Sequence, residues 1–286
     1  MPKKIIRTTP SLFNNWSLCP TKGYYTDIRQ IGLSDVKGNG SSPAMEIGTL
    51  IHKMLEVYYQ LLQWSASDTR ETRRLEAIAF GRRAAVDLTT LTSDDVETGI
   101  RTFNDYLAWY KDEDIKPVEV EAAFSRVLFE NDEYQVLLEG KKDLVAILQG
   151  IKWVIDHKTT GRKGVLSPMS NQFFAYAWAS DVNTVVINSI GTQKTTEPKE
   201  RFRRLFVSFT PNQIQEWYEN TVNEISLWLQ YIERGKYPMN LVSCRNNFGL
   251  CQFHAICSGD VADRERIIAV HYKHREPHDP WSDSDG

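Results

Sequence analysis

The sequence predicts an α/β protein in which a mixed sheet is flanked by helices and one long helical insertion interrupts the core. Three observations predict this. Apolar residues recur at helical spacing from Glu46 to Leu62, β-rich segments separated by turn signals follow from Pro117, and a helix and further strands come after them. With 41% hydrophobic and 25% charged residues among 286, the chain can bury an ordinary globular core.

The first half of the chain predicts helices. Residues 30–43 are rich in Gly and Ser and predict a loop ahead of the Glu46–Leu62 helix. A second helical stretch is expected over Asp68–Lys111, where apolar residues again alternate with charged ones. We interpret residues 66–112 as an insertion that covers one side of the core, because it is too long for a simple connection.

The second half predicts strands and two helices. Turn signals at Asn131-Asp132 and Gln149-Gly150 separate three strands, namely VEVEAAFSRVLFE, YQVLLEGKKDLVAIL and IKWVIDHK. A short helix at about Pro168–Ser180 and the strands VNTVVINSI and RFRRLFVSF follow. A long amphipathic helix then runs over Pro211–Arg234, with Thr210 as its N-cap. The polar ending HREPHDPWSDSDG predicts a disordered tail.

The totals bear on the compartment and on charge. No stretch approaches the roughly 20 consecutive apolar residues of a membrane span, and the N-terminal lysines precede no apolar signal segment. We therefore expect a cytoplasmic protein without a membrane partner. The net charge of -3 gives no global sign of nucleic-acid binding. Local basic clusters at Arg162-Lys163 and at Arg201, Arg203 and Arg204 are either DNA contacts or solvated surface.

Two aspartates are predicted to face each other. A symmetric turn at Gln149-Gly150 places Asp143 opposite Asp156, with Cβ atoms roughly 4.5–5.5 Å apart. Lys158 lies two residues further, on the same face. Adjacent carboxylates repel unless a cation lies between them, which favours Mg²⁺ or Mn²⁺. The alternative is a surface hairpin with ordinary charges. A bound metal would activate water, and the lysine would orient that water or neutralise developing charge.

Three more side chains are candidates for this centre. His52 lies in an apolar helix, with Gly48 one turn earlier to permit close approach of another backbone. It is either a core histidine or a further metal ligand. Gln172 and Tyr176 share one face of the short helix, and they either contact the lysine or DNA or simply pack.

The cysteines form one distant residue and one group. Cys19 lies near the N-terminus, and Cys244, Cys251 and Cys257 lie near the C-terminus. Disulfides are not expected in a reducing cytoplasm. Four thiolates suit zinc or an iron–sulfur cluster, but structural zinc usually takes two closely spaced pairs.

Together these motifs resemble the RecB-type branch of the PD-(D/E)XK nuclease superfamily. They occur in that family's order: Gly48-Thr-Leu-Ile-His52, Gly140-Lys-Lys-Asp143, Ile155-Asp156-His-Lys158 and Gln172-Phe-Phe-Ala-Tyr176. The resemblance implies a restriction-endonuclease-like fold and a metal held by His52, Asp143, Asp156 and the His157 carbonyl. It assigns catalysis to Asp143, Asp156, Lys158, Gln172 and Tyr176. Glu121, in the preceding strand, matches a glutamate that the family often has.

The cysteine pattern resembles the subset of this branch that carries a [4Fe–4S] cluster. In the CRISPR-associated adaptation nuclease, the AddAB-type nuclease and small single-strand exonucleases, one cysteine before the core and three after it tie the termini together. The six-residue gap from Cys244 to Cys251 is longer than is usual there. This organisation implies an N-terminal segment 1–44 with the first cluster cysteine, a helical region 45–112 with the metal-ligand histidine, a nuclease core 113–236, a cysteine segment 237–262 and a polar tail 263–286.

The expected function is metal-dependent exonuclease action on single-stranded or end-exposed DNA. Such an enzyme would serve recombination, repair or phage DNA processing in a prokaryotic or phage-infected cell. The 66–112 insertion could arch over the metal centre. Unpaired bases could stack on Phe173, Phe174, Tyr176 or Trp178, but we expect at least two of these rings to lie in the core instead. The alternatives are a DNA-binding module whose catalysis has lapsed and a nuclease subunit that works with a helicase or recombination protein. The chain has no G-x-x-x-x-G-K-[ST] phosphate loop of its own.

Overall fold

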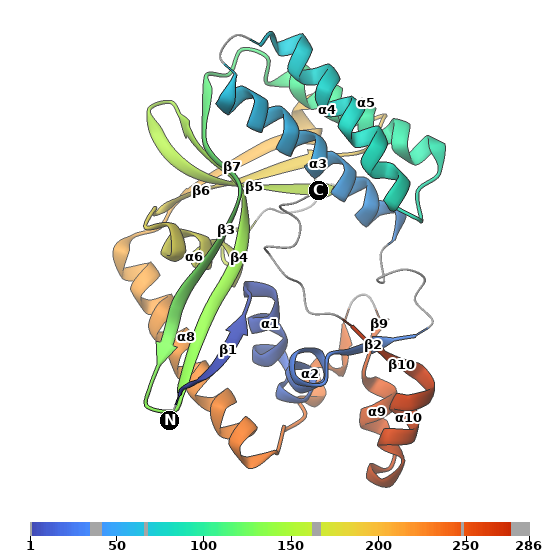
Figure 1. The fold of residues 1–286 in the computed structure, drawn as a ribbon, viewed down its shortest axis with the longest axis vertical. Helices are drawn as coiled ribbons and strands as arrows, with labels where there is room; N and C mark the ends of the chain where they lie inside the picture. The colour runs from blue at the N-terminus through green and yellow to red at the C-terminus, as the bar shows by residue number, and fades with distance from the viewer. Residues whose placement is uncertain (1, 35–41, 66–67, 162–166, 247–248, 276–286) are drawn as a thin grey trace. The chain divides into compact units, whose positions relative to one another are not determined.

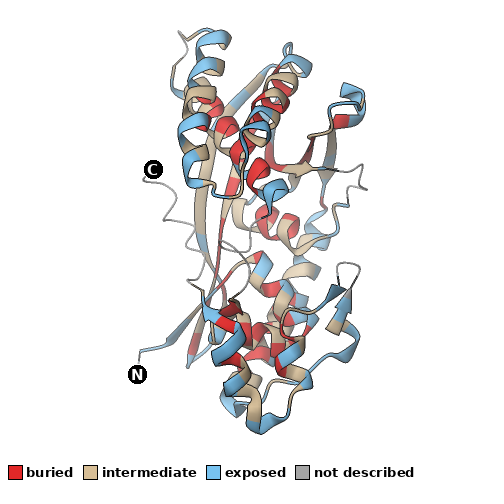
Figure 2. Cartoon of the chain, turned by 90° about the vertical axis from the view of Figure 1, so that its right-hand side faces the viewer, coloured by how far each residue is buried: buried red, intermediate tan, exposed pale blue. Residues whose placement is uncertain are grey.

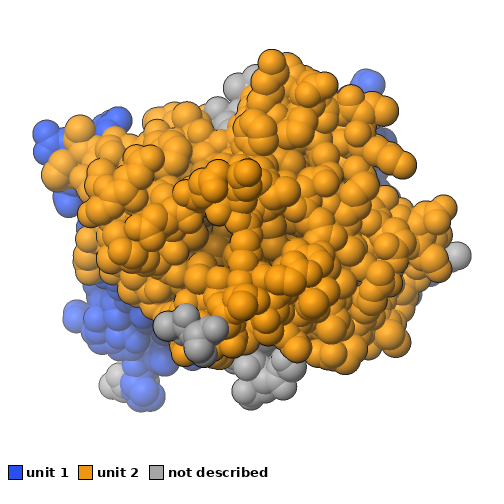
Figure 3. Space-filling model, turned by 90° about the horizontal axis from the view of Figure 1, so that it is seen from above, with its two compact units in different colours: residues 1–37, 124–140, 212–286 blue, residues 38–123, 141–211 orange. Residues whose placement is uncertain are grey.

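The computed structural model describes residues 2–34, 42–65, 68–161, 167–246 and 249–275 (Figure 1). The chain forms two compact units, which Figure 3 colours separately. The cysteine unit consists of residues 1–37, 124–140 and 212–286, and the site unit consists of residues 38–123 and 141–211. All four cysteines lie in the first unit, and every other candidate site residue lies in the second.

The main sheet is mixed, as the sequence predicts. Its order is β1-β4-β5-β6-β7, and β3 pairs with β4. Strand β5 runs parallel to β6, whereas the β4–β5 and β6–β7 pairs are antiparallel. The strands are β1 (Lys4–Thr8), β3 (Ile115–Glu130), β4 (Tyr134–Leu148), β5 (Ile151–Thr160), β6 (Thr184–Gly191) and β7 (Phe202–Ser208). Strand β1, which joins β4 in parallel, was not predicted.

The turn between β4 and β5 sets the register of the site. Gln149 and Gly150 have φ angles of 54° and 77°, the left-handed conformation that a two-residue type I′ hairpin needs at both positions. The ladder pairs Leu148 with Ile151 and continues to Leu144 with Ile155. This is the predicted register, and its next two positions are Asp143 and Asp156.

A helical layer packs against β5 and β6 in the site unit (Figure 1). The layer consists of α3 (Pro43–Trp64), α4 (Arg70–Ala84) and α5 (Ser93–Trp109). Leu50, Phe103 and Ile155 are fully buried in the shared core, and Figure 2 colours such residues red. The stretch predicted over Asp68–Lys111 is therefore two helices, because Thr92 and Asp95 form a capping box that starts α5 anew.

The remaining helices of the site unit are short. Helix α6 (Asn171–Ser180) packs against β5 and β6, and α7 (Pro198–Arg201) precedes β7. None of the helices in the described ranges carries an apolar stretch of the length that crosses a bilayer.

The cysteine unit brings segments from both chain ends into contact. Its elements are α1 (Pro10–Leu18), α2 (Pro20–Gly23), a π-helical turn (Tyr24–Ile28), β2 (Ile31–Leu33), α8 (Pro211–Arg234), β8 (Arg245–Asn246), β9 (Gly249–Leu250), α9 (His254–Ser258), α10 (Arg264–His271) and β10 (Tyr272–His274). Trp16 of α1 stacks on Trp228 of α8 with ring centroids 5.5 Å apart. Helix α8 has the predicted bounds.

Two sequence predictions are corrected in this unit. Ile31–Leu33, predicted as loop, is strand β2, because Ile31 pairs with His274 of β10 and so gains a main-chain partner from the other end of the chain. The same pairing makes His274, the first residue of the ending predicted to be disordered, the last residue of β10. The predicted polar tail 263–286 therefore contains α10 and β10 in its first half. Residues 35–41 of the predicted loop and 276–286 of the predicted tail lie outside the described residues.

Candidate active site

The structure gathers the predicted site residues around the free end of the β4–β5 ladder. Past the last paired residues, the His157 amide donates a hydrogen bond to Asp143 Oδ2 at 2.7 Å. The same oxygen lies 3.7 Å from Nδ1 of His52 on α3. The His52 imidazole also interacts with the main chain of His157. A carboxylate, an imidazole and one stretch of main chain thus meet at a single place.

Helix α3 approaches β5 closely beside this point. A Cβ atom added to Gly48 would lie 2.5 Å from Thr159 Oγ1, which is too close for any larger residue without a shift. Gly48 therefore permits a close approach, as predicted, but the neighbour is the Thr159 side chain and not a backbone. Gly48 lies one turn before His52, so this packing brings the histidine to the strand.

Asp156 has one satisfied and one unsatisfied oxygen. Its Oδ1 accepts hydrogen bonds from Lys158 Nζ at 3.2 Å and from Gln172 Nε2 at 3.0 Å. Lys158 Nζ also lies 2.9 Å from Oδ2. That contact is close but poorly directed, since Oδ2 is buried without a hydrogen bond among the described residues. Asp156 therefore keeps an acceptor oxygen available in a protein-lined site.

Burial and mutual repulsion disfavour the charged forms of both aspartates. Burial raises the pKa of Asp143 and of Asp156, and the charge of Asp143 raises that of Asp156 further. Burial also lowers the pKa of His52, so its imidazole is neutral and keeps a lone pair. Ionisation of both aspartates is unfavourable in this buried site. A cation bound beside the neutral imidazole would remove the repulsion between the two carboxylates.

The donor set fits a hard divalent cation. No three His, Cys, Asp or Glu side chains of the described residues already form a ligand group, so a bound ion would draw the donors in. The available donors are two carboxylates, one imidazole and main-chain oxygen, which Mg²⁺ and Mn²⁺ accept. The unsatisfied Asp156 Oδ2 is the observation on which this fit rests.

Helix α6 holds the lysine in place. Lys158 Nζ donates to Gln172 Oε1 at 2.9 Å, and Gln172 Nε2 donates to the Tyr176 hydroxyl at 2.9 Å. The Tyr176 hydroxyl donates in turn to the Lys141 carbonyl at 2.9 Å. Gln172 thus orients Lys158, and Tyr176 anchors the helix to β4.

Three of the four candidate base-stacking rings are core residues, the alternative that the sequence analysis left open. Phe173, Phe174 and Tyr176 are only 5%, 6% and 6% exposed, because α6 turns these rings into the core. Trp178 is half-buried. Helices α4 and α5 of the predicted insertion pack on α3 and share its core.

Glu121 lies beside the centre, with two residues that the sequence analysis missed. Its φ of 48° is rare for a residue other than glycine, and its carboxylate pairs with Lys141 Nζ at 3.1 Å. Burial and then Asp143 raise the pKa of Glu121 to about 7, and Glu56 raises it further. Glu56 follows His52 by one helical turn, a spacing that could have identified it.

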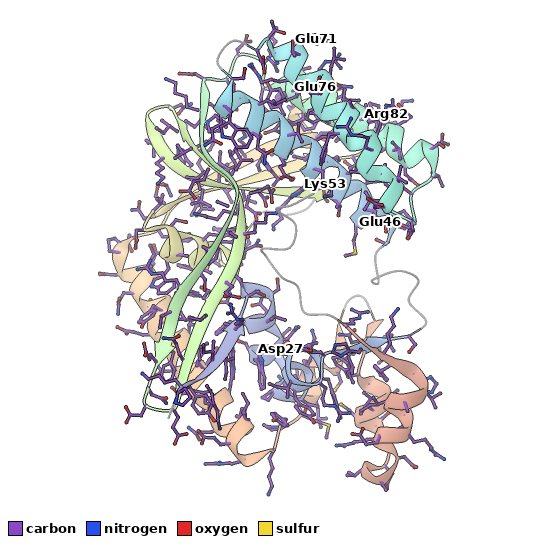
Figure 4. All side chains as sticks on the ribbon, in the orientation of Figure 1. Asp27, Glu46, Lys53, Glu71, Glu76 and Arg82 are labelled. Atoms are coloured by element: carbon purple, nitrogen blue, oxygen red, sulfur yellow. The ribbon has the colours of Figure 1, made fainter. Side chains whose placement is uncertain are left out.

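Two arginines of the second basic cluster predicted from sequence are buried in ion pairs. Arg201 pairs with Asp105 at 2.8 Å and Arg204 pairs with Glu113, and both arginine side chains are buried. Interpretation of these two as solvated or DNA-contacting residues is wrong, since α5 and the residues after it cover them. Arg162 and Lys163 lie outside the described residues. Helix α4 presents mixed charge, with Glu71, Glu76 and Arg82 along it (Figure 4).

The four cysteines form no disulfide in the described part of the chain, and Cys257 interacts electrostatically with the other three. Burial raises the pKa of Cys257 to about 11, and Cys19, Cys251 and Cys244 raise it further. The Cys251 amide donates to the Cys244 carbonyl at 2.8 Å, and the Asn240 amide donates to Cys19 Sγ at 3.3 Å. Thiols from both ends of the chain therefore lie in one neighbourhood of the cysteine unit.

The strand that carries D-x-K beside a second aspartate, on a mixed sheet flanked by helices, agrees with the resemblance to nucleases found in the sequence. A family profile described as the PD-(D/E)XK nuclease superfamily matches residues 7–258, and the chain belongs to this superfamily. No curated protein matches the chain.

Several solved structures are similar to this chain at low sequence identity. A candidate exonuclease from Eubacterium rectale is similar over 97% of this chain and 92% of its own, with a TM-score of 0.50 and 10% identity. SSO0001 is similar over 75% of this chain and 96% of its own, at a TM-score of 0.33 and 16% identity. LHK-Exo, solved in complex with dAMP, covers 66% of this chain and 97% of its own, at a TM-score of 0.31 and 10% identity.

Proposed function

We propose that this protein is a metal-dependent deoxyribonuclease that hydrolyses phosphodiester bonds from DNA ends and prefers single strands. The convergence of Asp143, Asp156 and His52, with Lys158 alongside, carries the proposal. The resemblance to RecB-type nucleases supports DNA as the substrate.

Each residue of the centre has a role in this proposal. His52, Asp143, Asp156 and the His157 carbonyl would hold Mg²⁺ or Mn²⁺, which supplies a water of lowered pKa and charge neutralisation. The Lys158 ammonium would donate a hydrogen bond to the attacking water or to a phosphate oxygen. Gln172 holds that ammonium, because its Oε1 accepts from Lys158 at 2.9 Å. Tyr176 fixes α6 against β4.

The charge state of the centre supports an active enzyme over a lapsed binding module. Two buried acids that repel each other cost stability when ionised. A protein that bound DNA without cleaving it would gain from replacing one of them. The pair instead lies beside a lysine that donates hydrogen bonds to Asp156 and Gln172.

The substrate preference rests on the absence of a motor in the sequence. Without a phosphate loop the chain cannot itself drive unwinding, so it would take DNA that is already open or frayed. A helicase or recombination protein could provide such ends. Repair, recombination and phage DNA processing all generate them.

We further propose that Cys19, Cys244, Cys251 and Cys257 ligate a [4Fe–4S] cluster, with zinc as the alternative. Their mutual influence on the pKa of Cys257 supports a shared site. Their spacing, one distant cysteine and three close ones, favours the cluster over zinc.

Digestion of end-labelled DNA tests the proposed activity. A linear single strand, a circular single strand and a blunt duplex of equal length are incubated with Mg²⁺ or Mn²⁺. We expect rapid loss of the linear strand, slow loss of the duplex, and no cutting by the Asp156→Asn variant. Rapid cutting of the circle would exclude an end requirement, and equal rates on the duplex would exclude the single-strand preference. No cutting of any DNA would overturn the activity itself.

A further inference from the structure

A network of buried polar side chains lies on the face of β5 turned away from Asp156. Its members are His157, Asn188, Arg204, Tyr106, Tyr59 and Glu113. Side chains alternate along a strand, so Asp156 and Lys158 face α6 while His157 faces the helical layer. The His157 ring lies parallel to that of Tyr59 on α3, with centroids 5.9 Å apart. It meets the His52 ring edge-on, also at 5.9 Å.

His157 has one polar partner for its ring in the described part of the chain. Its Nδ1 lies 2.7 Å from Asn188 Nδ2 on β6, while its Nε2 is buried without a hydrogen bond there. The orientation of the ring about its long axis thus depends on Asn188. Because Asn188 is directly paired with His157 across the parallel β5–β6 ladder, the contact spans adjacent strands.

Arg204 determines which way the Asn188 amide points. Arg204 Nε donates to Asn188 Oδ1 at 3.2 Å, and a guanidinium can only donate. The amide oxygen must therefore face Arg204, and the amide nitrogen must face His157. Nδ1 of His157 is then the acceptor of this hydrogen bond. Arg204 on β7 therefore determines how Asn188 contacts His157 on β5, two strands away.

Tyr106, Tyr59 and Glu113 complete the polar network. The Tyr106 hydroxyl accepts from Asn188 Nδ2 at 3.0 Å and from Arg204 at 2.8 Å. It lies 3.1 Å from the Tyr59 hydroxyl, on the helix that carries His52. Arg204 pairs with Glu113, and the two side chains are 4% and 16% exposed.

Such a network is costly in a core that is otherwise apolar. Removing a buried ion pair from water costs several kcal/mol per ion, and well-packed apolar residues are often as stabilising. Leu50, Phe103 and Ile155 show that this layer otherwise packs by apolar contact. The network therefore needs a reason beyond stability.

We propose that Arg204 and Asn188 are positioning residues for the metal centre. They fix the His157 ring, and the ring fixes the β5 main chain whose amide meets Asp143 at 2.7 Å and whose carbonyl would face the ion. This inference rests on the proposed metal-dependent function. Outer-shell contacts of this kind typically change metal affinity or activity about 10–100-fold.

Metal affinity of the full-length protein tests the proposal without reference to cleavage. Mn²⁺ dissociation constants are measured by titration calorimetry and by the electron paramagnetic resonance of free Mn²⁺. We expect Arg204→Lys, which keeps the charge opposite Glu113 but loses Nε, to weaken Mn²⁺ binding about 10-fold or more. Asn188→Leu, which is close to isosteric, should weaken it similarly. The double variant should lose no more than the larger single loss, because both act through His157.

Arg201→Lys provides the matched control. Like Arg204, Arg201 is a buried arginine in an ion pair, and its partner is Asp105 of α5. Unlike Arg204, its Nε donates to the Gly191 carbonyl, at 3.2 Å, and does not contact Asn188. It should change thermal stability and leave Mn²⁺ affinity within about twofold. Unchanged affinity in both network variants, or an equal loss in Arg201→Lys, would overturn the positioning role. If wild-type protein and its Asp156→Asn variant bind Mn²⁺ equally, the proposed metal centre itself fails.

Discussion

The main-chain amide of His157 is satisfied by the side chain of Asp143, at 2.7 Å, and not by the main chain of β4. The backbone ladder ends at the pair before it, Leu144 with Ile155. The aspartate therefore has two functions that can be separated. It accepts the hydrogen bond of the first β5 amide beyond the ladder, and it carries one of the two carboxylates of the candidate centre.

Substitution of Asp143 should separate these functions. Asp143→Asn keeps an oxygen for the His157 amide and loses the charge, so we expect near wild-type stability without cleavage. Asp143→Ala leaves a buried amide unpaired and should also lose about 1–3 kcal/mol of unfolding free energy. Urea unfolding and DNA digestion measure the two effects. Cleavage by Asp143→Asn at near wild-type rate would show that the active-site assignment is wrong.

Removal of Lys158 should affect catalysis more than binding. Lys158→Ala is expected to lower the cleavage rate about 100-fold or more, the usual scale for losing one transition-state stabiliser, while Mn²⁺ and DNA still bind. Lys152→Ala, at an exposed position on the same strand, is the control and should cleave normally. A loss of DNA affinity with unchanged single-turnover rate would instead assign Lys158 to substrate binding.

Substitution of any one of the four cysteines should abolish the proposed cluster. Anaerobically purified protein is expected to be brown, with about four iron and four sulfide per chain for a cubane cluster. Cys19→Ala and Cys257→Ala should each bleach the protein and lower its melting temperature, since each removes one ligand of a shared site. Absorption spectra and metal analysis measure this. Colourless protein with stoichiometric zinc would replace the cluster by the zinc alternative.

Asp27, in the cysteine unit, predicts a pH dependence of stability. Burial raises its pKa from 3.8 to about 6, against hydrogen bonds from Thr26 and Trp16 that lower it. The folded state then binds the proton more tightly than the unfolded chain, so this stabilisation is complete below pH 3.8 and is lost as pH rises through about 6. The loss is at most about 3 kcal/mol, since one pKa unit is about 1.4 kcal/mol.

Asp27→Asn should remove that dependence. Relative to wild type, its unfolding free energy should rise between pH 4 and pH 7, as measured by urea unfolding across this range. Asp132→Asn, at an exposed turn of the same unit, should follow wild type throughout. Parallel curves for Asp27→Asn and wild type would contradict the burial of this carboxyl.

The sequence by itself determined the parts of the site that depend on local geometry. A two-residue turn at Gln149-Gly150 allows one register, and the two-residue period of a strand then puts Asp156 and Lys158 on one face. The helical period likewise puts Gln172 and Tyr176 on one side of α6, where both join the lysine's hydrogen bonds. These relations span few residues and need no knowledge of the remainder of the fold.

Only the tertiary structure decided which residues far apart in the chain meet. Arg201 and Arg204 look like surface charges in sequence, but α5 and the residues after it supply Asp105 and Glu113 and bury them. The sequence left open whether Phe173 and Phe174 stack on bases or lie in the core, and the packing of α6 buries both. The pairing of Lys141 with Glu121 and the contact of Asn188 with His157 also depend on packing between separate strands. Periodicity reports which way a side chain faces along its own element, whereas its partner is set by the packing of other elements against that face.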